Sequence, residues 1–421
     1  MACQKPYRFV HTADLHLDSP LKSLALLDPA LGDLVGNATR RTLTRIVDLC
    51  IDESVDALLI AGDLYDGKQK SQKTAASLSA EMRRLQAHHI RVFIIKGNHD
   101  AESVLTRSLR LPDNVHIFDG RGSTVLVDER IKIHGVSFRH RHAPDSLLNK
   151  FAVPDDDLLH IGIMHTSIDG SPNHDPYAPC ALSDLINFGY DYWALGHIHK
   201  RKVHNAKPAV VMPGIPQGRH INESGPCSVT LVSLQKGQPP QIEFRAVDVV
   251  AFRTLTIDVS DTSNWNSVLG KIDRALTETT ESRNAAQMIL RLLLTGHTDL
   301  AFELTDQQAR LHEESKHLAS EHAGLWIERL KISVSINSNS VDDSNDDIAI
   351  EQLIDDDLLK STALQMQVDE EWSTLKKLLP ARERDFLGKS EAAQAEIKEQ
   401  LLSEGIARVM ARLQSTEDYA D

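Results

Sequence analysis

Five short motifs rich in carboxylate and imidazole side chains follow one another through the first half of this 421-residue chain. They are Asp14-Leu15-His16, Gly62-Asp63-Leu64-Tyr65-Asp66, Gly97-Asn98-His99-Asp100, His165 and Gly196-His197-Ile198-His199. Carboxylates, imidazoles and an amide oxygen together form a mixed ligand set for divalent cations. Two such cations about 3.5–4 Å apart can clamp a phosphoryl group and activate a water near neutral pH. The motifs therefore predict a metal site of two ions and a hydrolase.

The elements that must position these motifs are buried strands. An apolar run ends in or precedes each motif, and the runs are Tyr7–Val10, Ala57–Ile60, Val92–Ile95, Leu158–Met164 and Tyr192–Leu195. Because the ends of parallel strands converge on one rim of a sheet, we expect the five motifs to meet in one place. Two ligands separated by one residue would lie on the same side of a strand, as in Asp14-x-His16 and His197-x-His199.

The residue types suggest different roles within the site. Asp63 is the natural carboxylate to bridge two ions, and Asn98 offers a neutral oxygen that limits the charge of the site. His99 is adjacent to Asn98 and cannot easily bind the same ion. We therefore expect His99 to act as an acid or to hold phosphate.

The order of expected elements predicts two sheets packed face to face with helices outside. Helical spacing of apolar residues appears over 40–53 and 71–88, between the first strands, and short strands follow from 115 to 247. Residues 252–336 then read as a separate small unit in the order strand, helix, strand, helix, strand.

The C-terminal region differs in composition from the rest of the chain. Residues 338–357 are rich in Asp, Ser and Asn, which predicts a mobile acidic linker, and 358–421 contains two helical segments. The second segment has an apolar stripe made of Ile397, Leu401, Ile406, Val409, Met410 and Leu413. Such a stripe packs either on its own protein or on a partner helix.

Charge is distributed unevenly. Residues 1–250 contain 28 Lys+Arg and 28 Asp+Glu, and the remaining 18 and 32 give the net charge of −14. An acidic chain does not suggest DNA binding, which normally needs basic surface. The local basic clusters are Lys68, Lys70 and Lys73, then Arg139 and Arg141, then Lys200, Arg201 and Lys202.

Other residues receive ordinary structural interpretations. The histidines His134, His140, His142 and His174 lie outside the motifs, and we expect them on the surface or in loops. The four cysteines are scattered, which is typical of reduced thiols in an intracellular protein. No apolar stretch approaches the roughly 20 residues of a membrane span, so we expect a cytoplasmic protein, associated with the nucleoid at most.

The motifs together resemble the calcineurin-like metallophosphoesterase superfamily, whose pattern is Asp-x-His, Gly-Asp-x-x-Asp, Gly-Asn-His-Asp/Glu, His and Gly-His-x-His. The resemblance covers residues 6–250 with no motif missing. The longer strings 11–20 and 192–201 are similar to SbcD-type DNA repair exonucleases of the YhaO-like branch. This resemblance implies a four-layer α/β/β/α catalytic domain over 1–250, a small α/β capping domain over 251–337, an acidic linker over 338–357 and C-terminal helices over 358–421.

The resemblance also implies the site residues. One metal would bind Asp14, His16, Asp63 and His199, and the second would bind Asp63, Asn98, His165 and His197. His99 would steady the scissile phosphate or protonate the leaving oxygen, and Asp66 would orient His99. Manganese is the usual metal of the family. Lys200, Arg201 and Lys202 are candidate contacts to DNA phosphates.

The resulting functional hypothesis is a two-metal DNA nuclease of DNA repair, with exonuclease action on DNA ends favoured and single-strand endonuclease action as a variant. The alternatives are a metallophosphoesterase that acts on a different phosphoester, and a subunit that tethers DNA ends for an SMC-like ATPase. The family resemblance implies DNA as a partner and a homodimer. It also implies that the C-terminal helices contact the coiled coil of an SMC-like ATPase.

Overall fold

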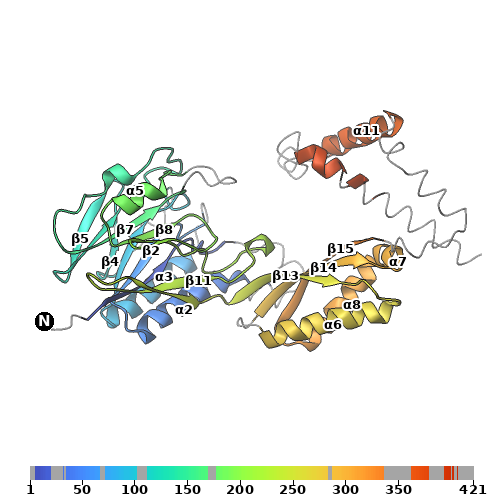
Figure 1. The fold of residues 1–421 in the computed structure, drawn as a ribbon, viewed down its shortest axis with the longest axis horizontal. Helices are drawn as coiled ribbons and strands as arrows, with labels where there is room; N and C mark the ends of the chain where they lie inside the picture. Colours follow the sequence, from blue (N-terminus) through green and yellow to red (C-terminus); the bar gives the residue numbers. More distant parts are fainter. Residues whose placement is uncertain are drawn as a thin grey trace, which may run out of the picture. The chain divides into compact units, whose positions relative to one another are not determined.

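The computed structural model describes residues 5–19, 32, 35–66, 72–101, 111–168, 177–282, 287–335, 362–378, 393–399, 401–402 and 405 (Figure 1). The chain divides into two units. The first comprises Met1–Thr254 with Arg283–Leu290, and the second comprises Leu255–Ser282 with Arg291–Asp421.

The first unit contains two six-stranded sheets. One sheet has the order β12-β11-β1-β2-β3-β4, and the other has the order β5-β6-β7-β8-β10-β9. In the first sheet the strands are β1 (Tyr7–Thr12), β2 (Ala57–Ala61), β3 (Arg91–Ile95), β4 (Val115–Ile117), β11 (Ser228–Leu234) and β12 (Gln241–Ala246). Strands β1 to β4 are parallel, and β11 pairs antiparallel with both β1 and β12.

The second sheet has a parallel centre and antiparallel edges. Its strands are β5 (Ser123–Val127), β6 (Ile131–Gly135), β7 (Leu159–His165), β8 (Tyr192–Gly196), β9 (Lys202–Ala206) and β10 (Ala209–Met212). Strands β6, β7, β8 and β10 are parallel, whereas β5 and β9 pair antiparallel with their neighbours. The sequence did not predict β9, since its residues alternate without a buried apolar run.

The two sheets pack face to face because their central strands are apolar on both sides. All residues of β2 and β8 are buried, and one apolar cluster joins Phe9 and Leu59 of the first sheet to Ile161 and Tyr192 of the second. Helices α2 (Ala38–Asp52) and α3 (Gln72–Ala87) cover the outer face of the first sheet, and α5 (Leu182–Asn187) packs on the outer face of the second. The predicted four-layer α/β/β/α sandwich is confirmed.

The second unit is a small α/β structure. A three-stranded sheet of order β13-β14-β15 is formed by β13 (Val250–Asp258), β14 (Gln287–His297) and β15 (Leu325–Ser335), with helices α6 (Trp265–Ser282), α7 (Ala301–Asp306) and α8 (Gln308–Glu321). Apolar side chains of α6 and α8, such as Ile272 and Leu311, are buried. Where the sequence predicted a single second helix in this unit, the structure has two, α7 and α8, which meet at Gln307.

The C-terminal region is described only in part. Helix α11 spans Thr362–Leu378, and residues 393–399 are also helical. The predicted linker 338–357 and the stripe residues Ile406, Val409, Met410 and Leu413 lie outside the described residues. No helix in the described part of the chain is long and apolar enough to cross a membrane.

The prediction for His134 is wrong. His134 lies on β6 and is buried, with its Nε2 atom 3.0 Å from Nδ1 of His160 and its Nδ1 atom 2.8 Å from the hydroxyl of Thr124. Its ring stacks on Tyr190. A polar residue in a strand pattern usually indicates a solvent-facing position. Here hydrogen bonds satisfy both ring nitrogens of His134, so the side chain can be buried.

Candidate metal centre

The structure places each motif at the end of the strand that was expected to carry it, or within two residues after that end. These strands are β1, β2 and β3 in the first sheet and β7 and β8 in the second, and each of the two sets is parallel. Hydrogen bonds join the strand ends of the two sheets. The Asp14 carboxylate accepts the backbone N–H of His197 at 3.0 Å, and Nδ1 of His165 lies 2.9 Å from the carbonyl oxygen of Ala61.

Four of the predicted ligands have left-handed backbone conformations. The φ angles are 53° for Asp14, 42° for His16, 50° for Asp63 and 104° for His197. Residues other than glycine rarely adopt such angles, and they concentrate at functional sites. Asp14 and His16 do come together as expected, but the expected cause, the alternation of side chains along a strand, is wrong. Strand β1 ends at Thr12, and the two side chains converge through a left-handed turn.

Ligand atoms of the motifs gather in three overlapping groups. Within each group the atoms lie within 4.8 Å of one another, and the groups are Asp14/His16/His199, Asp14/Asp63/His165 and His16/Asp63/His99. Two of the groups share Asp14 and two share Asp63. The structure thus brings together two neighbouring sets of oxygen and nitrogen donors.

Asn98 and His197 lie beside the second of these sets. The side-chain oxygen of Asn98 is 3.0 Å from Nε2 of His165, which is also 3.5 Å from a carboxylate oxygen of Asp63. The rings of His165 and His197 have centroids 5.2 Å apart. On the other side, the Nε2 atoms of His16 and His199 approach to 3.2 Å. Oxygen and nitrogen atoms that could bind a metal therefore approach one another from several side chains.

Glycine permits this close approach at Gly97. A Cβ atom at Gly97 would lie 2.2 Å from a carboxylate oxygen of Asp63, which is an impossible contact. The same carboxylate oxygen accepts the backbone N–H of His99 at 2.9 Å. Gly97 of the third motif is thus required for the packing of Asp63 in the second motif.

Burial controls the electrostatics of the cluster. Desolvation raises the pKa of Asp14 and of Asp63, while it lowers the pKa of His16 and brings the pKa of His165 to about 3. Burial thus favours neutral groups, and a bound cation would favour ionised carboxylates and neutral imidazoles. One oxygen of Asp14, Oδ1, is buried and accepts no hydrogen bond from any described residue. These residues fit a divalent metal centre.

The two predicted catalytic residues lie at the edge of this cluster. Nδ1 of His99 is 3.3 Å from a carboxylate oxygen of Asp66, and both side chains are about one-quarter exposed, at 27% and 25%. The hydrogen bond that His99 donates to the Asp66 carboxylate raises the pKa of His99 and lowers that of Asp66. The His99 ring lies 5.0 Å from that of His16. His99 is thus near the donor groups and is accessible to solvent.

Asp100 supports the site in a way that sequence reasoning missed. Its buried carboxylate accepts the backbone N–H groups of Leu64 and Tyr65 at 2.9 Å each and that of Gly97 at 3.2 Å. It therefore joins the second motif to the third. The residue was visible as the last member of Gly-Asn-His-Asp, but nothing in the sequence indicated which N–H groups it binds.

Glu223 and Arg219 are a second feature that the motifs did not reveal. A carboxylate oxygen of Glu223 lies 2.8 Å from Nδ1 of His199 and 2.7 Å from Nη2 of Arg219. These residues follow the last motif by about twenty positions, in a stretch without a repeated pattern. Only the fold brings them to the ligand.

The three candidate DNA contacts differ in their surroundings. Lys200 and Lys202 are exposed, whereas the guanidinium of Arg201 donates to the hydroxyl of Thr230 at 2.6 Å and lies over the ring of Phe244. Of the other basic residues, Lys73, Arg139 and Arg141 are exposed. Lys68 and Lys70 lie outside the described residues.

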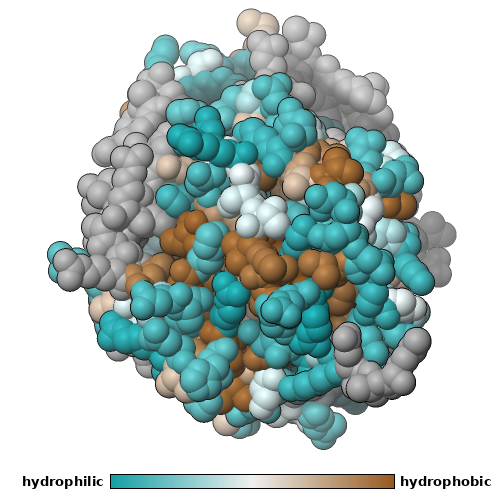
Figure 2. All heavy atoms as spheres, turned by 90° about the vertical axis from the view of Figure 1, so that its left-hand side faces the viewer, coloured by the Kyte–Doolittle hydropathy of each residue, from teal (hydrophilic) through white to brown (hydrophobic). Residues whose placement is uncertain are grey.

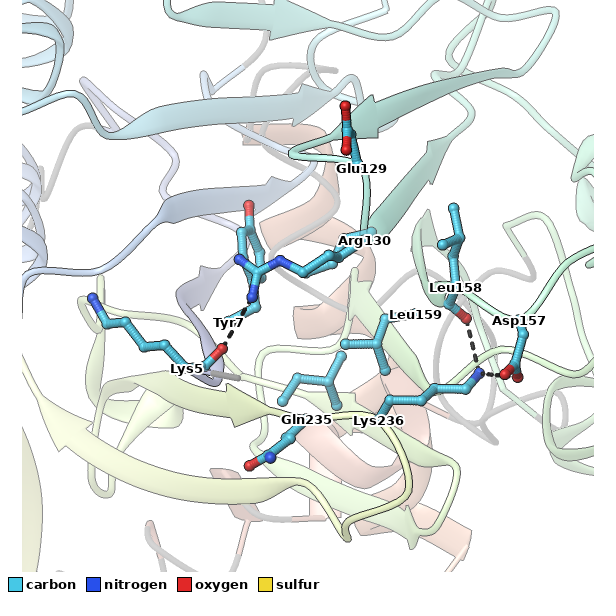
Figure 3. Close-up of a pocket in the computed structure, with 11 residues that line it drawn as sticks. Lys5, Tyr7, Glu129, Arg130, Asp157, Leu158, Leu159, Gln235 and Lys236 are labelled. Carbon is cyan, nitrogen blue, oxygen red and sulfur yellow. Dashed lines mark hydrogen bonds and ion pairs between the residues drawn. The ribbon is translucent and has the colours of Figure 1, made fainter. Parts of the chain in front are cut away.

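A pocket of about 280 Å³ occurs at the opposite ends of the same strands (Figure 3). It is lined by Tyr7, Ile131 and Leu159, the first residues of β1, β6 and β7, and by charged residues that include Lys5, Arg130 and Lys236. Figure 3 shows Arg130 reaching the carbonyl of Lys5, and Lys236 reaching Leu158 and Asp157. None of the motif residues lines this pocket, so it is separate from the donor cluster.

Comparison with known proteins agrees with this geometry. Residues 7–201 match the calcineurin-like phosphoesterase family, and residues 252–335 match the middle domain of the metallophosphoesterase YhaO. The uncharacterized metallophosphoesterase YhaO of Bacillus subtilis is 33% identical over 298 residues, which cover 68% of this chain and 71% of that protein.

Two more distant relatives have names that mention DNA repair or nuclease action. The DNA double-strand break repair protein Mre11 of Methanocaldococcus jannaschii is 23% identical over 63% of this chain and 73% of its own length. The SbcD protein of the nuclease SbcCD from Staphylococcus epidermidis is 25% identical over 46% of this chain and 56% of its own length. By its family matches and its similarity to YhaO, the chain belongs to the calcineurin-like metallophosphoesterase family, in the group that includes YhaO.

Proposed function

We propose that this metallophosphoesterase is a manganese-dependent DNA nuclease of DNA repair that acts on DNA ends, with single-strand endonuclease action as a secondary activity. The observation that carries the phosphodiesterase chemistry is the convergence of the Asp14/His16/His199 and Asp14/Asp63/His165 groups. The choice of DNA as substrate is supported by the relatives named as Mre11 and as part of the nuclease SbcCD.

Seven residues would hold two divalent ions. We assign Asp14, His16, Asp63 and His199 to one ion, and Asp63, Asn98, His165 and His197 to the other. When bound, the ions would polarise a phosphodiester and supply an activated water for its hydrolysis. The mixture of carboxylate, amide and imidazole donors suits manganese better than a closed tetrahedral zinc site.

The hydrogen bonds of the ligands fix which atoms are offered. Nδ1 of His165 donates to the carbonyl of Ala61, so that its Nε2 atom keeps a lone pair that faces Asp63 and Asn98. Asp14 uses one oxygen to accept the His197 N–H and retains the other, and Asp63 likewise accepts the His99 N–H with one oxygen. The side chains are held in position before any ion arrives.

His99 would donate the proton that the leaving oxygen needs. Its Nδ1 atom lies 3.3 Å from an Asp66 carboxylate oxygen, and this hydrogen bond raises the pKa of His99, which favours the protonated imidazole that a general acid needs. Asp66 would act by orienting His99.

The exposed lysines suggest where a DNA backbone would lie. Lys200 and Lys202 follow the ligand His199 directly, and both are exposed. By contrast, Figure 2 shows that the face at the left of Figure 1 has apolar side chains gathered near its centre. Because phosphate backbones bind basic surface, we place DNA at the motif end of the strands.

The C-terminal helices would bind a partner, namely the coiled coil of an SMC-like ATPase. Large apolar side chains are exposed in this segment at Met366, Leu375, Leu378 and Leu401, with exposed fractions of 68%, 39%, 77% and 50%. Exposed apolar side chains on a helix suit a partner helix. A homodimer that holds duplex DNA also belongs to the proposal.

The test is digestion of end-labelled duplex DNA with manganese, with a nitrophenyl phosphodiester assayed in parallel and His99→Ala as the control against contaminating nucleases. We expect wild-type protein to hydrolyse both substrates and the variant to hydrolyse neither at a comparable rate. Hydrolysis of the small diester with intact DNA would contradict the DNA substrate and retain the phosphodiesterase.

The second candidate is the same metal centre acting on a different phosphoester. The observation in its favour is that residues 1–250 have no net charge, with 28 Lys+Arg and 28 Asp+Glu. The parallel assay separates the two candidates. A third possibility, a subunit that mainly tethers DNA ends, predicts DNA binding with very slow hydrolysis of both substrates.

A further inference from the structure

A buried carboxylate contacts the imidazole of one predicted metal ligand on the side away from the other donors. Oε1 of Glu223 lies 2.8 Å from Nδ1 of His199, while Nε2 of His199 lies 3.2 Å from Nε2 of His16. The two nitrogens of His199 thus have separate partners. A carboxylate accepts the Nδ1 proton, and Nε2 faces the donor cluster with its lone pair.

Glu223 is held by a second residue through several hydrogen bonds. Arg219 donates from Nη2 to Oε1 at 2.7 Å, from its backbone N–H to Oε2 at 2.8 Å, and from Nε to both oxygens at 3.2 Å. The Glu223 side chain is only 7% exposed. Although burial opposes ionisation, the hydrogen bonds from His199 and Arg219 keep the pKa of Glu223 well below its usual range.

The backbone around this pair is anchored in the first unit. Glu223 ends a short 3₁₀ helix, Ile221–Glu223, in which Ile221 is buried. At the start of the same segment, the buried side chain of Gln217 donates to the carbonyl of Val250 and accepts the N–H of Val249. Glu223 therefore reaches His199 from a fixed support.

His199 is held less tightly by burial than His165 is. Its side chain is 29% exposed, whereas His165 is fully buried and donates to a backbone carbonyl. A carboxylate partner fixes the ring orientation and increases the basicity of the nitrogen that binds metal. A neutral backbone carbonyl has the same effects, but they are weaker because it carries no charge.

We propose that Glu223 is the positioning residue of the metal ligand His199 and that Arg219 keeps the Glu223 carboxylate in place. The inference rests on the proposed metal function of His199. The ion bound by Asp14, His16, Asp63 and His199 then depends on Glu223, whereas the ion bound through His165 does not depend on it directly.

The experiment measures binding of Mn²⁺ to metal-free full-length protein by titration calorimetry, with stoichiometry checked by elemental analysis. Glu223→Ala removes the hydrogen bond and the charge, and Glu223→Gln removes the charge alone. Glu81→Ala is the matched control, because the Glu81 side chain is 11% exposed and pairs with Arg84 of α3 and Thr44 of α2, on the helices that cover the outer face of the first sheet.

We expect Glu223→Ala to weaken the binding of one of the two ions by about 10–100-fold and Glu223→Gln by about tenfold. Glu81→Ala should bind both ions as the wild type does. Wild-type affinity for both ions in the Glu223 variants would overturn the proposal. If Glu223→Ala does not fold, the titration of Glu223→Gln decides alone.

A second measurement separates positioning from a purely structural role. Long-range ¹H–¹⁵N spectra of the metal-free protein report which nitrogen of His199 carries the proton. We expect protonation of Nδ1 in the wild type and in Glu81→Ala, and loss of that preference in Glu223→Ala. An unchanged tautomer in Glu223→Ala would contradict the positioning role.

The titrations also distinguish a failure of the proposed metal centre from a failure of the role proposed for Glu223. A wild-type protein that binds no Mn²⁺ contradicts the metal centre itself. A wild-type protein that binds two ions but whose Glu223 variants bind them equally well contradicts only the role of Glu223.

Discussion

Two roles of His99, as a general acid and as a metal ligand, agree with its position, and measurements can distinguish them. Its Nδ1 atom contacts Asp66 at 3.3 Å, which suits a general acid, yet it also belongs to a donor group with His16 and Asp63. An acid and a ligand predict different consequences when the imidazole is removed. An acid affects the rate of hydrolysis, and a ligand affects the binding of metal.

For His99→Ala we expect kcat on a nitrophenyl phosphodiester to fall by about 10²–10⁴-fold, the usual contribution of general acid catalysis. Mn²⁺ affinity, measured by calorimetry, should stay within about twofold of wild type because the assigned ligands remain. Much weaker Mn²⁺ binding would instead identify His99 as a ligand.

Gly97 provides a test of the packing that holds Asp63. In Gly97→Ala the added methyl group would collide with the Asp63 carboxylate at 2.2 Å, so this carboxylate must move. Because we assign Asp63 to both ions, we expect binding of both to weaken, by about 10–100-fold.

Gly270→Ala is the matched control for this prediction, because the added methyl group would have no described atom within 4 Å other than those of its chain neighbours and its own helix backbone. Titration calorimetry with Mn²⁺ measures both variants. Equal affinity of Gly97→Ala and Gly270→Ala would show that Asp63 adapts to the methyl group, contrary to the prediction.

The sequence could identify residues but not the contacts that position them. The five motifs named Asp14, Asp63 and His165 because residue type and order are visible in the chain. The left-handed backbone of Asp14 and the contact of Glu223 with His199 depend on atoms supplied by distant segments. No local pattern encodes such contacts, so these features had to come from the structure.

At the scale of elements, strand order explains why the site forms at one rim. Strands β1, β2 and β3 are parallel neighbours, as are β7 and β8, so their carboxyl ends lie together within each sheet. This much followed from the apolar runs in the sequence. The burial of His134 on β6 did not, because its partners Thr124 and His160 belong to different strands.

Buried histidines in these strands should make the fold sensitive to acid. Burial, together with the neighbouring charges of His160 and Lys132, lowers the pKa of His134 to about 4, against about 6.5 in the unfolded chain. The unfolded state therefore binds the proton first as the pH falls. The free energy of unfolding should decrease between pH 6.5 and 4, by up to about 1.4 kcal/mol per pH unit for this group.

Denaturant unfolding at several pH values between 7 and 4 checks this prediction. His134→Gln should show a shallower decrease than wild type over this range, even if its stability at pH 7 is lower. His140→Gln is the control, since His140 is exposed. Parallel curves for wild type and His134→Gln would contradict the assignment.

At the scale of the whole molecule, charge separates the catalytic region from the C-terminal region. Residues 251–421 contain 18 Lys+Arg against 32 Asp+Glu, and residues 1–250 are balanced. An acidic tail adds nothing to phosphate binding. Its exposed apolar residues, such as Met366 and Leu378, are better explained by a protein partner.

Removal of residues 338–421 should therefore separate the two functions. We expect the shortened chain to hydrolyse the nitrophenyl phosphodiester with unchanged kcat, because all assigned ligands lie before residue 200 and Glu223 is retained. Under our proposal of an SMC-like ATPase partner, co-purification with that partner should be lost. Loss of hydrolysis in a folded, shortened protein would show that the tail contributes to catalysis.

The location of the DNA can be tested by charge reversal at opposite strand ends. Lys200 and Lys202 follow the proposed ligand His199, whereas Lys5 and Lys236 line the pocket at the other ends of the strands. The two double changes to Glu alter the net charge equally. If DNA lies at the motif end, only Lys200→Glu/Lys202→Glu removes phosphate contacts.

We expect this variant to bind duplex DNA more weakly and to show a salt dependence of log Kd that is smaller by about 2, or about 1 for each lost phosphate contact. Its hydrolysis of the small diester should be unchanged, because we assign neither lysine to the metal ions or to proton transfer. Lys5→Glu/Lys236→Glu should bind DNA nearly as the wild type does. Equal losses in the two variants would mean that net charge, and not a defined path beside the metal centre, governs the attraction of DNA.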